Sequence, residues 1–265
     1  MAKKAAPAVK TKTKAKVSKP VKASTKAGAS KPVKTSTKAK VIANKPAGKK
    51  QHGVGVLVKP AVAKKVLDAL CATYPDADCE LTYDSPFQLL IAVILSAQCT
   101  DVTINKVTKA LFKHYPDARS LAEADIEHVK ELIKPSGFFN AKAKNIQACA
   151  QELVVRFNGI PPQTRDELTT LAGVGRKTAN VVLGVIHNIP GWTVDTHVQR
   201  LSKRLGFSLE EDPVKIEQDL EKLFPKQDWT KYSITIIWHG RRICFARKPD
   251  CPNCPVKELC PSAMA

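Results

Sequence analysis

Four cysteines near the carboxyl end of the chain have the spacing of a metal or cluster site. Cys244, Cys251, Cys254 and Cys260 are separated by six, two and five residues. Four thiolates in one short loop form a tetrahedral sulfur cage, which suits either Zn²⁺ or an iron–sulfur cluster. Disulfides are the alternative, but nothing else in the sequence indicates an oxidising compartment. The number of sulfur atoms alone does not distinguish zinc from iron.

A second pattern that could do chemistry is a glycine-rich turn ahead of a predicted helix. Residues Leu171–Ala179 read L-A-G-V-G-R-K-T-A, and the helix is expected to begin at about Arg176. Gly173 and Gly175 permit backbone conformations and close approaches that other residues do not. The free N–H groups of the first helical turn form an anion site, for which a DNA phosphate is a natural ligand. Tight helix–helix turns also use glycine for structural reasons, so this pattern alone is weak.

Two charged residues stand out near this turn. Lys177 lies at the predicted helix start, and Asp195 follows it by eighteen residues in the segment V-D-T-H-V. A lysine at a helix start is usually a solvated phosphate contact, and Asp195 is well placed as the N-cap of a helix that continues to Arg204. Taken singly, each residue therefore has an ordinary structural explanation.

The elements that must position these residues are predicted to be helices. Extended alternating segments are nearly absent, and only Ile234–Trp238 has a pattern that could be misread as a strand. The sequence therefore predicts an all-α fold. Helices are expected over Pro86 to about Ala97, Asp101–Tyr115, Ser120 to about Lys134, Asn140–Phe157, Thr164 to about Leu171, and Asp212 to about Phe224. Ser85 is the expected N-cap of the first helix and forms a capping box with Gln88. Ser120 with Glu123, and Thr164 with Glu167, are expected to open their helices in the same way.

Charge is distributed very unevenly along the 265 residues. Of the net charge of +19, residues 1–50 contribute sixteen lysines and no acidic or aromatic residue. This segment contains an internal repeat, because Ser18–Ala27 and Ser30–Ala39 differ at one position in ten. With no apolar face to bury, it is expected to be disordered. We interpret it as a polyelectrolyte arm that neutralises nucleic-acid phosphates, similar to linker-histone tails; a solubilising or targeting extension is the alternative.

No membrane or secretion signal is evident in the sequence. The longest apolar segment, Leu89–Leu95, is seven residues long and is interpreted as a core helix. The scattered cysteines Cys71, Cys79, Cys99 and Cys149 are expected to be free thiols in a reducing compartment. We therefore expect a cytoplasmic, nucleoid-associated protein if the source is bacterial and a nuclear one if it is eukaryotic.

Together, these motifs resemble the endonuclease III family of DNA glycosylases. Cys-x6-Cys-x2-Cys-x5-Cys is similar to the [4Fe-4S] loop of that family, and L-x-G-V-G-x-K-T-A to its helix-hairpin-helix. The V-D-T-H segment and Leu89–Gln98 extend the likeness, which runs from about Lys59 to Cys260. The lysine-rich segment lies outside it.

The resemblance implies a bifunctional DNA N-glycosylase and abasic-site lyase that carries a [4Fe-4S] cluster and acts on oxidised pyrimidines. In this family the residue at Lys177 is the nucleophile and the one at Asp195 its electrostatic partner. The chemistry suits these residue types, because breaking an N-glycosidic bond develops positive charge on the sugar, which a carboxylate stabilises. A lysine attacking the anomeric carbon forms a Schiff base that permits β-elimination.

The resemblance also implies which residues bind DNA. A flipped base leaves a gap that the family fills with a glutamine, here Gln98. A second wedge residue corresponds to Phe138, where the family more often has leucine; ordinary interhelical packing of Phe138 and Phe139 is the alternative. Ser96 and His197 are expected to line the pocket. Phosphate contacts are expected from Gly173, Val174, Gly175 and Arg176 of the hairpin, and from Arg247 and Lys248 in the cysteine loop.

By the family pattern, residues 79–189 form a six-helix barrel domain that contains the hairpin. Residues 56–78, with a helix near Val58–Pro75, join 190–265 in an iron–sulfur cluster domain, and residues 1–55 form the tail. We expect a monomer that binds double-stranded DNA with damaged bases or abasic sites and has no membrane partner. One alternative is a monofunctional mispair glycosylase, which Lys177 and the end of the chain five residues after Cys260 disfavour. Another is a non-catalytic chromatin protein with a zinc knot.

Overall fold

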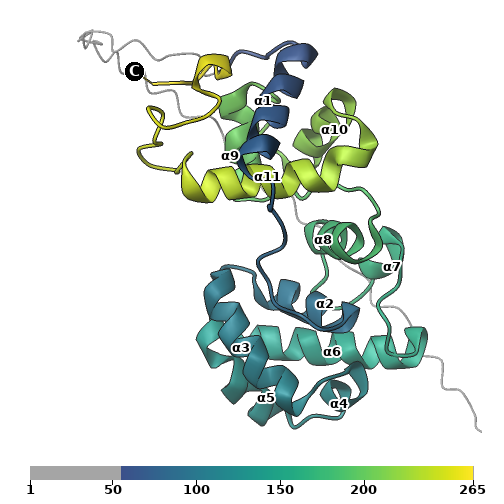
Figure 1. Cartoon of the computed structure of the whole chain (residues 1–265). Coiled ribbons are helices and arrows are strands. Elements are labelled where there is room, and N and C mark those ends of the chain that lie inside the picture. Colours follow the sequence, from purple (N-terminus) through teal and green to yellow (C-terminus); the bar gives the residue numbers. More distant parts are fainter. Residues whose placement is uncertain (1–54, 265) are drawn as a thin grey trace, which may run out of the picture. The chain divides into compact units, whose positions relative to one another are not determined.

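The computed structural model describes residues 55–264. They lie within a single compact unit. Every regular element of the described residues is a helix, which confirms the all-helical prediction (Figure 1). None of these helices is both long enough and apolar enough to cross a membrane. The predicted lysine-rich tail, apart from Gly55, falls outside the described residues.

A first group of helices surrounds α2 (Pro86–Leu95), which is apolar nearly all round. Every residue from Phe87 to Leu95 is buried, so this helix forms the centre of the first hydrophobic core. The other helices of the group are α3 (Asp101–His114), α4 (Ala118–Ala122), α5 (Ile126–Ile133), η1 (Lys134–Ser136), α6 (Phe139–Phe157), α7 (Arg165–Leu168) and α8 (Arg176–His187). The α-helices among them each contribute apolar residues to that core, and the short helix η1 connects α5 to the turn before α6.

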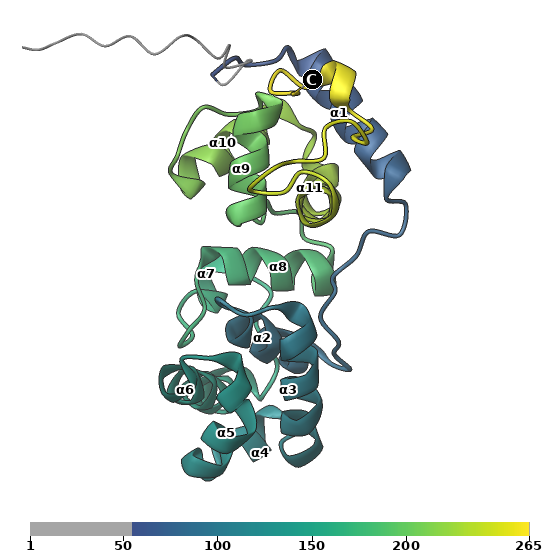
Figure 2. The ribbon, with the colours of Figure 1, turned by 90° about the vertical axis from the view of Figure 1, so that its left-hand side faces the viewer.

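A second group of helices has a separate core around the fully buried Trp192. Its indole packs against the rings of Phe224 and Tyr232, with ring centroids 5.6 and 6.5 Å away. The first helix of the described chain belongs here although it precedes α2 in sequence (Figures 1 and 2). The members are α1 (Pro60–Thr73), α9 (Thr196–Leu205), α10 (Pro213–Leu223), η2 (Lys226–Asp228), α11 (Trp229–Arg242) and η3 (Lys257–Leu259).

Helix starts follow the predicted caps in most places. Ser85, Thr164, Asp195 and Asp212 each accept a hydrogen bond from a backbone N–H of the helix that follows. The segment Ile234–Trp238 lies inside α11, so its strand-like pattern has no structural counterpart.

Three predicted caps were wrong. The N-cap before α4 is Asp117, which accepts from the Ser120 N–H at 2.8 Å while Ser120 Oγ accepts from the Asp117 N–H at 3.3 Å. Because α4 ends at Ala122 and α5 begins anew after the cap Asp125, the single helix predicted from Ser120 to Lys134 is two helices. Helix α6 starts after Phe138 rather than at Asn140. Gln88 Oε1 accepts from the N–H of Asp84, not of Ser85.

The Asp117 cap generates a stability prediction. The Ser120 N–H, and then the Ser120 hydroxyl, hold the pKa of Asp117 below its ordinary value. The carboxylate therefore stabilises the fold above its unfolded pKa, and this stabilisation is lost as the pH falls through the lowered pKa. Asp117→Ala should reduce the free energy of unfolding by about 1 kcal/mol at pH 7. In denaturant titrations, the difference in the free energy of unfolding between Asp117→Ala and the wild type should become smaller below about pH 4.

Ser120→Ala provides the matched control, since it removes the hydroxyl but keeps the capped N–H. We expect Ser120→Ala to reduce the free energy of unfolding by less than Asp117→Ala does. A larger loss for Ser120→Ala at pH 7 would contradict the assignment of Asp117 as the cap.

Candidate active site and cysteine loop

The glycine turn leads into α8 and presents Lys177. Gly173 has a φ of +76°, and a Cβ there would lie 3.0 Å from Cβ of Asn145, so both the turn and the packing require glycine. Gly175, at φ −95°, is the N-cap and has open space where a Cβ would be. No side chain accepts a hydrogen bond at this helix start. The first N–H groups of α8 are therefore available to an anion, and Lys177 lies exposed in the same turn.

Asp195 is fixed by the helix that it caps. Its Oδ1 accepts hydrogen bonds of 2.8 Å from the backbone N–H groups of His197 and Val198. The residue is half-buried, and among the described residues Oδ2 has no hydrogen-bond partner. The cap thus holds the carboxylate in one orientation while one of its oxygens remains open to a ligand.

Lys177, Asp195 and Ser96 line a single cavity of about 110 Å³. Three of the candidate residues, from segments far apart in sequence, are thus brought together. Ser96 Oγ donates to the carbonyl of Val93 at 2.8 Å, which fixes the hydroxyl at the end of α2. The apolar part of the cavity wall comes from the segment before α2 and from three helices: Leu81, Val93, Val181, Val185, Ile234, Ile237 and Trp238.

His197 lines a neighbouring hollow rather than this cavity. It shares that hollow with Cys99, Asp101 and Arg241. Burial lowers the pKa of His197, and the Arg200 charge lowers it further, whereas Asp195 raises it; the net direction is downward. The imidazole is therefore neutral at pH 7. Because the two hollows share Glu80, Asp101 and Arg241, His197 lies beside the cavity of Lys177 and Asp195, and its part in that pocket stays a prediction.

Gln98 and Phe138 lie at two exposed turns, both with left-handed backbones. Their φ angles are +56° and +49°, a conformation uncommon for residues other than glycine and one that carries strain. Phe138 is 70% exposed, which rules out the packing alternative for its ring, whereas Phe139 does pack against the first core. Neither Gln98 nor Phe138 lines the cavity.

Arg176 is placed differently from the phosphate contact that the sequence suggested. Its guanidinium binds Glu217 through two hydrogen bonds, Nε to Oε2 at 2.6 Å and Nη2 to Oε1 at 3.1 Å. This interaction raises the pKa of Arg176. The side chain is thus held by a carboxylate, and the backbone of Arg176 lies at the uncapped helix start. Arg247 and Lys248, by contrast, are exposed.

Some residues at the cavity were missed by sequence reasoning. Asp101, Trp238 and Arg241 all line it, but Asp101 was noticed only as a helix start. Trp238 and Arg241 lie in α11, whose sequence carries no local motif. Only the packing of α11 against α8 brings them to the site, so no signal in the sequence could have identified them.

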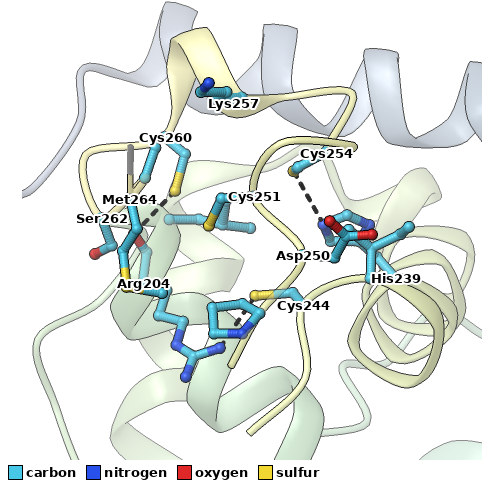
Figure 3. A pocket seen from close by; sticks show the side chains of 14 residues that line it. Arg204, His239, Cys244, Asp250, Cys251, Cys254, Lys257, Cys260, Ser262 and Met264 are labelled. Atoms are coloured by element: carbon cyan, nitrogen blue, oxygen red, sulfur yellow. Dashed lines mark hydrogen bonds between the residues drawn. The ribbon is translucent and has the colours of Figure 1, made fainter. Parts of the chain in front are cut away.

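The four cysteines Cys244, Cys251, Cys254 and Cys260 surround a cavity of about 400 Å³ (Figure 3). All are free thiols. Burial is the main cause that raises the pKa of Cys254, and it raises that of Cys260 to about 11. These thiols are therefore protonated at neutral pH, and a bound cationic centre would displace the protons.

Two further side chains contact the sulfur atoms. Arg204 Nη1 donates to Cys244 Sγ at 3.3 Å, and a ring nitrogen of the buried His239 lies 3.6 Å from Cys254 Sγ. Within residues 55–264, no three His, Cys, Asp or Glu side chains are arranged as ligands of a single metal ion. Four thiols around this cavity are a donor set that fits a [4Fe-4S] cluster, in which each of the four irons takes one thiolate.

Comparison with known proteins identifies the family. Residues 91–226 match the family model described as "HhH-GPD superfamily base excision DNA repair protein". Endonuclease III of Synechocystis sp. is 52% identical over 225 residues, which cover 84% of this chain and 98% of the relative. The chain belongs to the endonuclease III family. Endonuclease III of Bacillus subtilis is 44% identical and covers 73% of this chain and 89% of its own length.

Solved structures agree with this family assignment. A trapped endonuclease III–DNA covalent intermediate is 43% identical, covers 77% of this chain and 96% of its own, and has a TM-score of 0.74. A thermostable thymine-DNA glycosylase, at 21% identity and a TM-score of 0.69, shares the fold alone. The family predicted from the motifs is thus confirmed, and with it the enzyme class of a base-excision-repair glycosylase and lyase.

Proposed function

We propose that this endonuclease III family member excises oxidised pyrimidines from double-stranded DNA and cleaves the abasic site, with Lys177 as the nucleophile. The single observation that carries this proposal is the shared cavity of Lys177 and Asp195. An exposed amine at an uncapped helix start faces a carboxylate that is oriented by two backbone N–H groups. A nucleophile and an electrostatic partner are the two groups that glycosidic cleavage with Schiff-base formation needs.

Each residue has a distinct task in the proposed reaction. As the bond between the base and the sugar breaks, Asp195 stabilises the positive charge that develops on the sugar. The neutral amine of Lys177 then attacks the anomeric carbon, and ring opening gives a protonated imine. That imine acidifies the neighbouring C–H, so water can accept its proton while the 3′ phosphate leaves as an anion and a carbon–carbon double bond forms in β-elimination. Water hydrolyses the remaining imine and regenerates Lys177.

DNA binding would use the exposed turns and the start of α8. The backbone of Gly173–Arg176 would bind a phosphate at the uncapped helix start. Gln98 and Phe138, already exposed and held in left-handed conformations, would fill the space left by the flipped base. Arg247 and Lys248 would contact the phosphate backbone from the cysteine loop.

We propose that Cys244, Cys251, Cys254 and Cys260 hold a [4Fe-4S] cluster. When bound, the cluster would cross-link the carboxyl-terminal loop and supply structural order rather than a chemical step. Arg204 would also hold this loop in place, because its guanidinium donates to the carbonyls of Phe245 and Ala246 at 2.7 and 2.9 Å. It thereby fixes the part of the loop that carries Arg247.

The two hydrophobic cores support a division into two domains. We propose that residues 79–189 form one domain and that residues 56–78 together with 190–265 form the other. Residues 1–55 would be an added basic arm, and the protein would act where its DNA substrate lies, in the nucleoid of a bacterial cell.

Two substitutions test the assignment of the nucleophile and its partner. Lys177→Ala should abolish the borohydride-trapped covalent complex with abasic DNA, because no amine remains to form the imine. Its DNA affinity should change little, since the hairpin contacts come from backbone N–H groups. Asp195→Asn should reduce base excision by roughly 10²-fold, the scale of losing one electrostatic stabiliser. Undiminished trapping by Lys177→Ala would identify another amine as the nucleophile.

Removal of one cysteine ligand tests the cluster. Cys254→Ser should lower iron content, weaken DNA binding and disorder the carboxyl-terminal loop, while the core around α2 stays folded because it shares no residue with the loop. Iron analysis and circular dichroism measure these effects. Cys149→Ser, which changes a buried cysteine of the first core, is the control and should retain iron. Zinc in place of iron in the wild-type protein would overturn the cluster assignment.

Deletion of residues 1–50 tests the basic arm. Non-specific DNA binding should weaken, and the slope of log K against log salt should become shallower by several units because fewer counterions are released. Excision from a short damaged duplex should change little, since every residue assigned to the chemistry follows Ser85. Equal affinity and equal salt dependence with and without the segment would argue for targeting or solubility instead.

A further inference from the structure

The two residues assigned to the chemistry belong to different hydrophobic cores. Lys177 lies on α8, whose buried residues Ala179 and Val182 are part of the first core. Asp195 caps α9, whose Val198 and Leu201 are part of the second. Neither core alone fixes the separation between the amine and the carboxylate. That separation depends on whatever joins the two groups of helices.

One ion cluster joins them at the edge of the cavity. Arg241 of α11 contacts Glu80 and lies 2.6 Å from Asp101 Oδ2 through Nη1. Arg242 Nη2 lies 2.9 Å from Glu80 Oε1, and its guanidinium stacks 3.8 Å from the centroid of the Trp238 ring. Burial lowers the pKa of Arg241, but Asp101 and Glu80 outweigh it and raise the pKa overall. We call Glu80, Asp101, Arg241 and Arg242 the Arg241 cluster.

A second ion cluster joins α10 to α7 and α8. Its centre is the Glu217 carboxylate, whose side chain is only 4% exposed. Oε1 also accepts from Arg165 Nη1 at 3.3 Å and from Asn180 Nδ2 at 3.2 Å, in addition to the paired bonds from Arg176. A buried carboxylate is stable only when such donors surround it. We call Glu217 with its three partners the Glu217 cluster.

The two clusters hold different faces of the helix that carries Lys177. Lys177, Val181 and Val185 follow one another at intervals of four residues, and all three line the cavity. Arg176 and Asn180 lie on an adjacent face, and neither lines the cavity. Helix α8 is therefore held by Glu217 on one face, while the Arg241 cluster closes the cavity that its other face lines.

Between these clusters, α8 and α11 approach each other closely. A Cβ on Gly184 would lie 2.7 Å from both Oγ1 and Cγ2 of Thr230. This contact limits how near the helices can come, but by itself it provides little attraction to hold them together. Two hydrogen bonds add to it, from Asn180 Nδ2 to the Trp192 carbonyl at 2.7 Å and from Trp238 Nε1 to the Asp78 carbonyl at 3.0 Å. The charged contacts between the groups come from the two clusters.

We propose that the Glu217 and Arg241 clusters fasten the two groups of helices across the cavity, so that Glu217 and Arg241 are positioning residues for Lys177 and Asp195. The catalytic consequence rests on the proposed function of that pair. A misplacement of about 1 Å between reacting groups can reduce a rate by about 10²-fold. Loss of either cluster should therefore slow base excision without removing any group that reacts.

The test measures the separation of the two groups of helices directly. Spin labels on noncanonical residues replacing Lys109 in α3 and Lys222 in α10, both exposed, would leave the eight cysteines untouched. Pulsed electron resonance on the full-length, iron-loaded protein without DNA should give a narrow distance distribution for the wild type. Arg241→Gln and Glu217→Gln should broaden or shift that distribution.

Activity is measured on the same proteins without the labels. In both variants, single-turnover base excision should fall about 10- to 100-fold, whereas affinity for the same duplex should change much less. Trapping on a pre-formed abasic duplex should fall less than excision, because that step no longer needs the Asp195 carboxylate. Arg241→Lys, which retains a cation, should recover most of the excision rate.

Matched controls separate positioning from general destabilisation. Glu211→Gln breaks the Lys203–Glu211 ion pair of 3.1 Å, which lies within the second group at an 84% exposed side chain, and should change neither distance nor rate. If Glu217→Gln does not fold, Arg165→Gln, which removes one half-exposed partner, takes its place.

Two results would overturn the proposal. One is a distance distribution that is the same as that of the wild type in both Arg241→Gln and the Glu217-cluster variant. The other is a broadened distribution with an unchanged excision rate, which would remove the positioning role. Failure of the wild-type protein to excise or trap would refute the proposed function instead, and the distances would still decide whether the clusters act as fasteners.

Discussion

The candidate site depends on one constraint, namely that the first turn of an α-helix has N–H groups with no partner inside the helix. At α9 the constraint is met by Asp195, which uses one carboxylate oxygen for two N–H groups and keeps the other open. At α8 it is left unmet, because Gly175 has no side chain to offer. The same backbone chemistry thus orients the Asp195 carboxylate at α9 and leaves the first N–H groups of α8 without a side-chain acceptor.

Charged side chains in the described part of the chain also differ in whether they have partners within the protein. The buried carboxylate of Glu217 has donors from two arginines and an asparagine. The buried ammonium of Lys142 donates to the Ser136 carbonyl at 2.7 Å, whereas Lys177 and Arg247 are on the surface. Since an unpaired buried charge is costly, this division separates the charges that support the fold from those that are free to meet DNA phosphates.

Much of the helical fold could be predicted because its signals are local. Ser85, Thr164 and Asp212 cap helices within three residues of themselves, and apolar periodicity marks the buried faces. Errors arose where two local signals competed, as at Asp117 and Ser120, where either residue can cap and only the geometry of the preceding loop decides. The left-handed backbones of Gln98 and Phe138 had no sequence signal, because neither residue is a glycine or an asparagine.

The site was predictable to the extent that its residues lie in motifs. Lys177, Asp195 and the four cysteines lie in short, recognisable segments, and the structure gathers them around two cavities. Arg176 shows the limit of such reasoning, because its partner Glu217 is 41 residues away and belongs to a helix with no motif. Long-range pairs of this kind depend on how helices pack, which a single sequence does not report.

The placement of α1 has a consequence for how the chain folds as it is made. This helix is synthesised before the first core, yet its partners α9 and α11 follow it by more than a hundred residues. The segment before α1 also has a partner that is synthesised late, since the Val58 N–H donates to the Gly206 carbonyl at 2.9 Å. During translation the core around α2 can form while α1 still lacks its partners. The second core is therefore expected to close last, with the slow kinetics of contacts distant in sequence.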